Sequence, residues 1–102
     1  MATATANRAA TEIKVYIDSH RLPYREWYVG IASNGRDRVF NQHGVKERTD
    51  KWIICQPLPT STEAREVEAY FVDDLKTDGG KSGGDETTRT VYAYHKEAHT
   101  TE

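Results

Sequence analysis

The stretch that decides the fold is residues 26–44, EWYVGIASNGRDRVFNQHG. Aromatic and β-branched residues dominate residues 27–32, which is typical of a β-strand. The Ser-Asn-Gly sequence that follows predicts a turn with a side chain ready to cap a helix. Residues 36–43 predict a short helix, because Gly44 stands where a glycine often ends one. This stretch therefore places Tyr28, two arginines and a histidine within a few residues of one strand–helix junction.

A longer helix is predicted upstream of this stretch. Residues 8–20 place apolar side chains at helical spacing, although Ile13, Val15 and Ile17 also alternate as in a strand. We favour the helix, because the alanines and Glu12 have high helix propensity.

Three further elements follow downstream. Residues 51–58 predict a second strand, closed by prolines, and residues 90–95, TVYAYH, predict a third. Between them, residues 61–76 form the clearest helical pattern in the chain, with Thr60 and Glu63 arranged as a capping box. Together the elements predict an α+β fold, in which a small mixed three-stranded sheet is flanked by two or three helices.

The chain has 102 residues, which favours one domain. Residues 1–7 are small and polar, and we expect them to form a disordered N-terminal tail. We assign residues 8–96 to the single domain and residues 97–102 to a polar C-terminal tail. A domain of this size has little room for a deep internal cavity, so we expect any site to be a surface cleft.

Charge and cysteine content limit the possible functions. The formal net charge is −2, whereas proteins that bind nucleic acid alone are usually basic, so non-specific capture of DNA should be weak. Cys55 is the only cysteine, which excludes an intramolecular disulfide and a cysteine zinc cluster. No apolar run approaches the roughly 20 residues needed to span a bilayer, and the first residues lack the features of a secretory signal. We therefore expect a cytoplasmic protein that has no membrane association.

One carboxylate lies beside the apolar face of the predicted helix over residues 61–76. On a helical wheel, four side chains form a single apolar stripe: Ala64, Val67, Phe71 and Leu75. Glu68 lies next to this stripe, where an ionised carboxylate costs free energy unless it is paired or binds a cation. Glu68 therefore either pairs with an arginine or reaches solvent at the sheet edge, or it serves as a metal-binding or acid–base group.

These pieces resemble the GIY-YIG nuclease superfamily. The family's second signature strand ends in Tyr-Ile-Gly, which residues 28–30, YVG, match. The helix that follows carries an arginine and then a histidine, matched by Arg38 and His43, and a later helix supplies a glutamate, matched by Glu68 in AREVEAYFV. The resemblance covers about residues 26–76 and implies a small mixed sheet flanked by helices.

The resemblance also implies an activity, the metal-dependent cleavage of nucleic-acid phosphodiesters, with DNA as the expected substrate. Glu68 would hold a single divalent cation, Mg²⁺ or Mn²⁺, on the leaving side. Arg38 or Arg36 would bind the scissile phosphate, because a guanidinium can bond two phosphoryl oxygens at once. Tyr28 and His43 would handle the water and the proton transfer.

The first signature tyrosine of the family has more than one candidate. In the family it lies on a strand just before the second signature strand. Tyr16, in KVYI, stands at about that position. If residues 8–20 are helical, the neighbouring strand must come from elsewhere, and Tyr92 or Tyr94 would take this place in a permuted sheet.

The phosphate-binding residues also have more than one candidate. Arg38 has the family's distance from Gly30, whereas on an ideal helix Arg36 shares a side with His43. Lys81, in the glycine-rich loop TDGGKSGGDETT, could touch a phosphate backbone. The spacing from Arg38 to His43 is one residue longer than is usual in the family, and the family's late asparagine has no clear counterpart.

Two main functions follow from these features. The first is a metal-dependent endonuclease. The second is a catalytically inactive binding module on the same scaffold, for nucleic acid, a nucleotide-like small molecule or a protein. A third possibility is a homo-oligomer whose strand edges pair between chains, or a part of a larger protein complex.

Overall fold

A three-stranded antiparallel sheet forms the centre of the protein, and its strands are β1 (Trp27–Ala32), β2 (Trp52–Ile54) and β3 (Thr90–His95). We describe it from a computed structural model that covers residues 3–80 and 84–102. The strand order is β1–β3–β2, so the strand that comes last in the chain lies in the middle. A parallel bridge from Tyr28 to Asp78 continues the pairing beyond β1. The predicted α+β fold with a small three-stranded sheet is confirmed.

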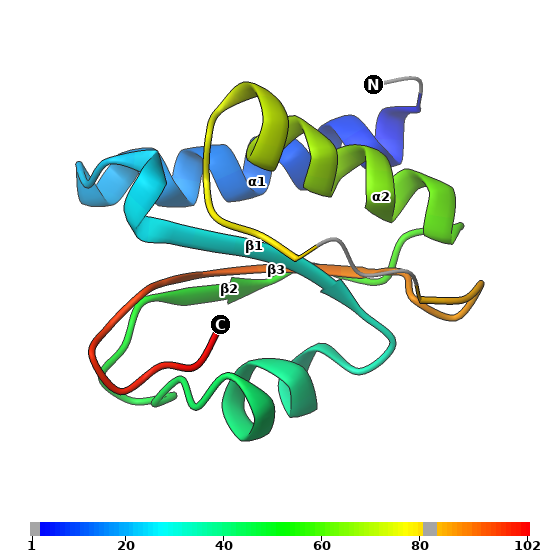
Figure 1. Ribbon diagram of the computed structural model, residues 1–102. Coiled ribbons are helices and arrows are strands. Elements are labelled where there is room, and N and C mark those ends of the chain that lie inside the picture. Colours follow the sequence, from blue (N-terminus) through cyan, green and yellow to red (C-terminus); the bar gives the residue numbers. More distant parts are fainter. Residues whose placement is uncertain (1–2, 81–83) are drawn as a thin grey trace.

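Helical segments lie on both faces of the sheet (Figure 1). Helices α1 (Ala4–His20) and α2 (Ser61–Ala69) form a layer on one face, and α2 continues into a wider helical turn, η3 (Tyr70–Asp74). A second wide turn, η2 (Asp37–Gln42), lies on the opposite face together with the C-terminal end of the chain. A short helical turn, η1 (Tyr24–Glu26), leads into β1.

The upstream helix is confirmed, but it begins earlier than the sequence predicted. Thr3 caps it by accepting a hydrogen bond from the Ala6 N–H at 3.1 Å, and Ala6 is fully buried. Thr3 and Thr5 also donate hydrogen bonds to the Glu63 carboxylate at the start of α2. The expectation that residues 1–7 form a disordered tail is therefore wrong for residues 4–7, because packing against α2 holds them in place.

The period-two alternation of β1 and β3 divides the core into two clusters. The larger cluster lies between the sheet and the α1–α2 layer, and β1 contributes Trp27, Val29 and Ile31 to it. The smaller cluster lies between the sheet and η2, and its buried members are Tyr28, Ala32, Val39, Val45, Tyr92 and Tyr94. Because side chains alternate along a strand, every second residue of TVYAYH faces η2.

The second strand is shorter than the predicted span of residues 51–58. Regular pairing ends after Ile54, where Pro57 and Pro59 follow closely, and proline cannot donate to a sheet ladder. The chain nevertheless keeps its contact with β3, because the Cys55 N–H bonds the Val91 carbonyl at 2.9 Å.

The polar tail folds back onto the domain. Its backbone turns so that the Thr100 N–H bonds the Glu97 carbonyl at 3.1 Å. The Thr101 N–H then donates to the His43 carbonyl at 2.7 Å. This contact brings residues 97–102 to the end of η2, next to the smaller cluster (Figure 1).

Candidate functional site

Three tyrosines from two paired strands share the sheet face that η2 covers. Tyr28 lies on β1, and Tyr92 and Tyr94 lie on β3, with Tyr28 paired directly with Tyr94. The Tyr28 and Tyr94 rings stack with centroids 5.3 Å apart and planes 20° apart. Between 0% and 8% of each residue is exposed, so the three aromatic rings lie in a nearly dry environment.

Gly30 makes room for the middle tyrosine of this group. It is the cross-strand partner of Tyr92, and a Cβ atom at this position would lie 2.4 Å from the Tyr92 hydroxyl oxygen. No side chain other than glycine's hydrogen allows the Tyr92 ring to lie across β1. The glycine of the YVG motif is therefore a packing requirement of this site.

His43 lies against the same hydroxyl groups. Its Nε2 is 2.8 Å from the Tyr92 hydroxyl, and its Nδ1 is 2.7 Å from the Thr101 carbonyl oxygen. A carbonyl can only accept, so Nδ1 carries a proton. Burial lowers the pKa of His43, so the ring is neutral at physiological pH and Nε2 accepts a hydrogen bond from Tyr92.

The wide turn η2 places Arg38 and His43 on the same side. The His43 N–H bonds the Arg38 carbonyl at 2.9 Å, which spans five residues where an α-helix spans four. Because each turn holds about one more residue than in an α-helix, Arg38 and His43 lie on the same side although five positions separate them. Burial raises the pKa of Tyr28 and of Tyr92, and the positive charge of Arg38 opposes this rise, which places the guanidinium within electrostatic range of both. Its Nε–H is buried and has no hydrogen-bond partner among residues 3–80 and 84–102.

Arg36 lies outside the cluster. Its guanidinium donates to both carboxylate oxygens of Glu47 at 2.8 Å and covers the ring of Phe40 at 4.9 Å, with 61% of the side chain exposed. An ideal helical wheel predicted that Arg36 shares a side with His43, because it assumed α-helical turns. The wider turns of η2 instead bring Arg38 to the tyrosines, so the two candidates are separated by structure.

Glu68 is buried as the helical wheel predicted. Only 8% of the residue is exposed, and its Oε2 atom has no hydrogen-bond partner within the described part of the chain. Burial raises the pKa of Glu68 to about 7, and the charge of Arg65 opposes this rise. The Glu68 charge in turn contributes to the raised pKa of Tyr28, after burial itself, and also raises the pKa of Tyr92. The carboxylate therefore lies within electrostatic range of both tyrosine hydroxyls, although it belongs to α2, on the sheet face opposite η2.

A metal ion would find one protein ligand here. Within residues 3–80 and 84–102, no three His, Cys, Asp or Glu side chains gather into a group that could hold a metal. The unpartnered Oε2 of Glu68 fits a single ligand to Mg²⁺ or Mn²⁺, because Mg²⁺ keeps several of its waters and often binds through one or two carboxylates and substrate phosphates.

Two other candidates from the sequence lie elsewhere. Tyr16 is on α1 and packs against Trp27 with ring centroids 5.8 Å apart, on the sheet face away from His43. Tyr92 and Tyr94 therefore take the place beside Tyr28, as the permuted alternative expected. Lys81 lies outside the residues that the structure describes.

The tail supplies site residues that the sequence reasoning missed. The Tyr94 hydroxyl donates to the Glu102 carboxylate at 2.8 Å, and the Thr101 carbonyl holds His43. The alternation in TVYAYH indicated that Tyr92 and Tyr94 lie on the same face of a strand. The polar sequence KEAHTTE carries no pattern that would indicate a return to the site.

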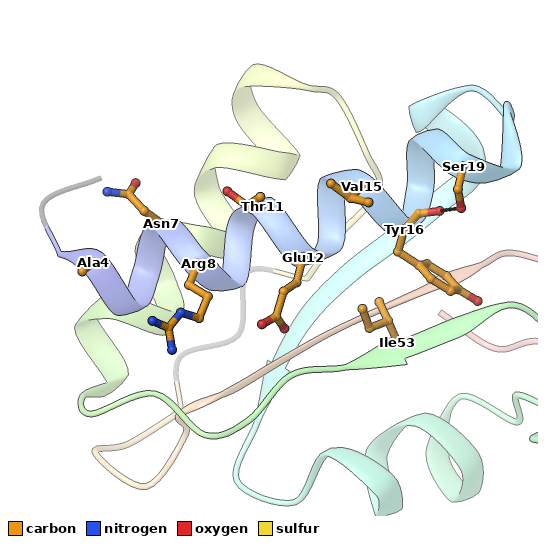
Figure 2. A pocket seen from close by; sticks show the side chains of 9 residues that line it. All are labelled: Ala4, Asn7, Arg8, Thr11, Glu12, Val15, Tyr16, Ser19 and Ile53. Carbon is orange, nitrogen blue, oxygen red and sulfur yellow. Dashed lines mark hydrogen bonds between the residues drawn. The ribbon is translucent and has the colours of Figure 1, made fainter.

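A separate groove of about 870 Å³ runs along α1 (Figure 2). Figure 2 shows Val15, Tyr16 and Ile53 along it, with Arg8 and Glu12 extending from the helix. None of its lining residues belongs to the cluster of Tyr28, His43 and Glu68, so it is not part of the candidate site.

Comparisons with known proteins find no counterpart: no family model, curated protein or solved structure matches this chain. Among the described residues, no helix is both long and apolar enough to cross a membrane.

Proposed function

We propose that this protein is a metal-dependent endonuclease that resembles the GIY-YIG superfamily in a permuted order. One observation carries the proposal: the carboxylate of Glu68 and the guanidinium of Arg38 each lie within electrostatic range of the Tyr28 and Tyr92 hydroxyls, although α2 and η2 cover opposite faces of the sheet. Phosphodiester hydrolysis needs these same components, namely a ligand for a cation, a cation for the phosphoryl oxygens, and a path for a proton.

Arg38 is the residue that binds the scissile phosphate in this proposal. It lies beside Tyr28 and Tyr92, and its buried Nε–H lacks a partner within the described part of the chain. A phosphoryl oxygen would satisfy this donor, because guanidinium and phosphate groups form charge-assisted pairs. Arg36 does not take this role, since its Nη2 already donates to both carboxylate oxygens of Glu47 and its charge is paired there.

The proton path runs from water through Tyr92 to His43. Burial raises the pKa of Tyr28 and of Tyr92, so both remain neutral phenols and neither removes a proton alone. His43 has a free lone pair on Nε2, which accepts the Tyr92 hydrogen bond. As water attacks phosphorus, its proton passes to the Tyr92 oxygen while the phenol proton passes to His43 Nε2. A P–O bond forms, the opposite P–O bond breaks, and His43 ends as an imidazolium.

Glu68 would hold the divalent cation, Mg²⁺ or Mn²⁺. When bound, the cation stabilises the negative charge that develops on the leaving oxygen. Ionised Glu68 is required to hold it. Since burial raises the pKa of Glu68 to about 7, we expect the affinity for the cation to weaken as the pH falls below that value.

A plasmid-cleavage assay with Mg²⁺ or Mn²⁺ tests the proposal. We expect wild-type protein to cut DNA, Glu68→Gln to lose cutting, and Arg38→Ala to lose about 100-fold or more. Arg36→Ala is the matched control, because it removes an exposed arginine from the same turn and should leave cutting nearly unchanged. If wild-type protein leaves DNA intact with each metal, the endonuclease proposal is wrong.

A catalytically inactive binding module is the second candidate. The formal net charge of −2, the missing late asparagine and the neutral tyrosines favour it. In that case Arg38 still binds a phosphate-containing ligand. Fluorescence anisotropy would then report DNA binding that weakens in Arg38→Ala but not in Arg36→Ala, with no cleavage in any variant. The absence of DNA binding would leave a nucleotide-like small molecule or a protein as the partner.

A further inference from the structure

The Thr101 main chain forms two hydrogen bonds with His43, one to its backbone carbonyl and one from its imidazole ring. The Thr101 N–H donates to the His43 carbonyl at 2.7 Å, and the His43 Nδ1–H donates to the Thr101 carbonyl at 2.7 Å. These two contacts join segments that lie 58 positions apart in the sequence. They fix both the position of the His43 backbone and the orientation of its ring.

The direction of each bond determines which ring nitrogen can take a proton. The Thr101 carbonyl has no hydrogen to offer, so Nδ1 must be the protonated nitrogen and Nε2 keeps its lone pair. Nε2 is the nitrogen that faces the Tyr92 hydroxyl at 2.8 Å. The opposite tautomer would place a hydrogen on Nε2 and would remove the acceptor for Tyr92.

Glu102 adds a negative charge near the Nδ1 side of the His43 ring. Its carboxylate accepts from the Tyr94 hydroxyl and from the Thr100 hydroxyl, each at 2.8 Å. The Tyr94 oxygen lies 3.0 Å from His43 Nδ1, so it is a second acceptor for the same hydrogen. Several titratable or charged groups from the surrounding elements influence or contact the ring: Tyr28, Arg38, Tyr92, Tyr94 and Glu102. Arg38 opposes a positive charge on the ring and Glu102 favours it.

We propose that residues 100–102 position His43 as a proton acceptor, with the Thr101 carbonyl selecting the tautomer and the Glu102 carboxylate stabilising the imidazolium. Thr101 and Glu102 are positioning residues, because they act on Tyr92 and water only through His43. The catalytic consequence rests on the proposed nuclease function, whereas the tautomer and the titration of His43 do not.

NMR of ¹⁵N-labelled full-length protein tests the positioning directly. We expect the long-range ¹H–¹⁵N pattern of His43 to show the Nδ1–H tautomer at pH 8 in the wild type. In Glu102→Gln we expect the same tautomer but a titration midpoint at lower pH, because the charge that favours the imidazolium is gone. Glu97→Gln is the control, since the Glu97 carboxylate bonds His95 at 2.6 Å, and it should leave both properties of His43 unchanged.

A second variant removes one of the two hydrogen bonds by which Thr101 positions His43. Thr101→Pro lacks the N–H that bonds the His43 carbonyl, so we expect a mixture of tautomers and a cleavage rate lower by about tenfold or more. Near-UV circular dichroism checks that this variant is folded, and Glu102→Gln carries the test if it is not. An Nε2–H tautomer in the wild type, or a His43 midpoint that does not move in Glu102→Gln, overturns the proposal. The tautomer and the titration midpoint of His43 can be measured even if the wild type cuts no DNA. They therefore test this inference separately from the nuclease function.

Discussion

Gly30 is the single residue on which the geometry of the tyrosine cluster depends. We predict that Gly30→Ala destabilises the fold by about 1–3 kcal/mol, because the added Cβ would lie 2.4 Å from the Tyr92 hydroxyl oxygen and the buried ring has little room to move. Urea unfolding measures the loss. Ser33→Ala, at an exposed position just after β1, is the control and should change little. Equal stability of Gly30→Ala and wild type would contradict this account of the strand glycine.

Glu68 makes stability depend on pH. Its pKa is about 7 in the folded protein against an ordinary value of 4.5, so the folded state holds this proton more tightly. The free energy of unfolding therefore falls as the pH rises from about 4.5 through 7. The full shift corresponds to about 3 kcal/mol, and solvent screening reduces the expected effect to about 1–2 kcal/mol.

We predict that Glu68→Gln removes this dependence. In EDTA, the variant should be more stable than the wild type at pH 8 and similar to it at pH 5, as measured by urea denaturation. Addition of Mg²⁺ at pH 8 should stabilise the wild type and not the variant, because only the carboxylate binds the cation. If the difference in the free energy of unfolding between variant and wild type is the same at pH 5 and pH 8, burial does not raise the pKa of the Glu68 carboxyl group.

At the scale of elements, the wide turns of η2 keep Arg38 and His43 on one side although one extra residue separates them. We predict that deletion of Asn41, an exposed residue whose amide bonds Asp37 at 2.9 Å, lets the segment adopt ordinary α-helical turns. Arg38 and His43 would stay on the same side, so the loss of stability should be under about 2 kcal/mol. NMR of the histidine ring should still show Nδ1–H. Insertion of an alanine after Asn41 is the contrasting change and should turn His43 away from Tyr92.

The elements show how far local sequence patterns reach. The alternation in TVYAYH and the apolar stripe beside Glu68 predicted strand β3 and the buried carboxylate correctly, because each depends on a regular period. The choice between Arg36 and Arg38 depended on the width of the helical turns, which no residue in the segment reveals. The packing of residues 4–7 depended on Glu63, about 60 positions away, so propensity alone could not predict it.

At the scale of the whole molecule, the sequence predicted the α+β class but not how distant segments meet. The position of β3 between β1 and β2 follows from pairing over long sequence separations. The permuted alternative anticipated that Tyr92 and Tyr94 would lie beside Tyr28, and the structure places them there. The return of residues 100–102 to His43 rests on two hydrogen bonds in which the tail contributes only the Thr101 main chain, to the His43 carbonyl and to its ring Nδ1, so the tail's composition gave no sign of it.

The late position of the central strand also has a consequence for biosynthesis. While the ribosome is still making residues 1–89, β1 and β2 lack the strand that joins them, because each pairs with β3 and not with the other. The nascent chain can form α1 and α2 locally, but the sheet must wait until residues 90–95 emerge from the exit tunnel. Until then the strand edges that will face β3 remain unpaired and available to chaperones, and mutations that slow translation of residues 90–95 would prolong that interval.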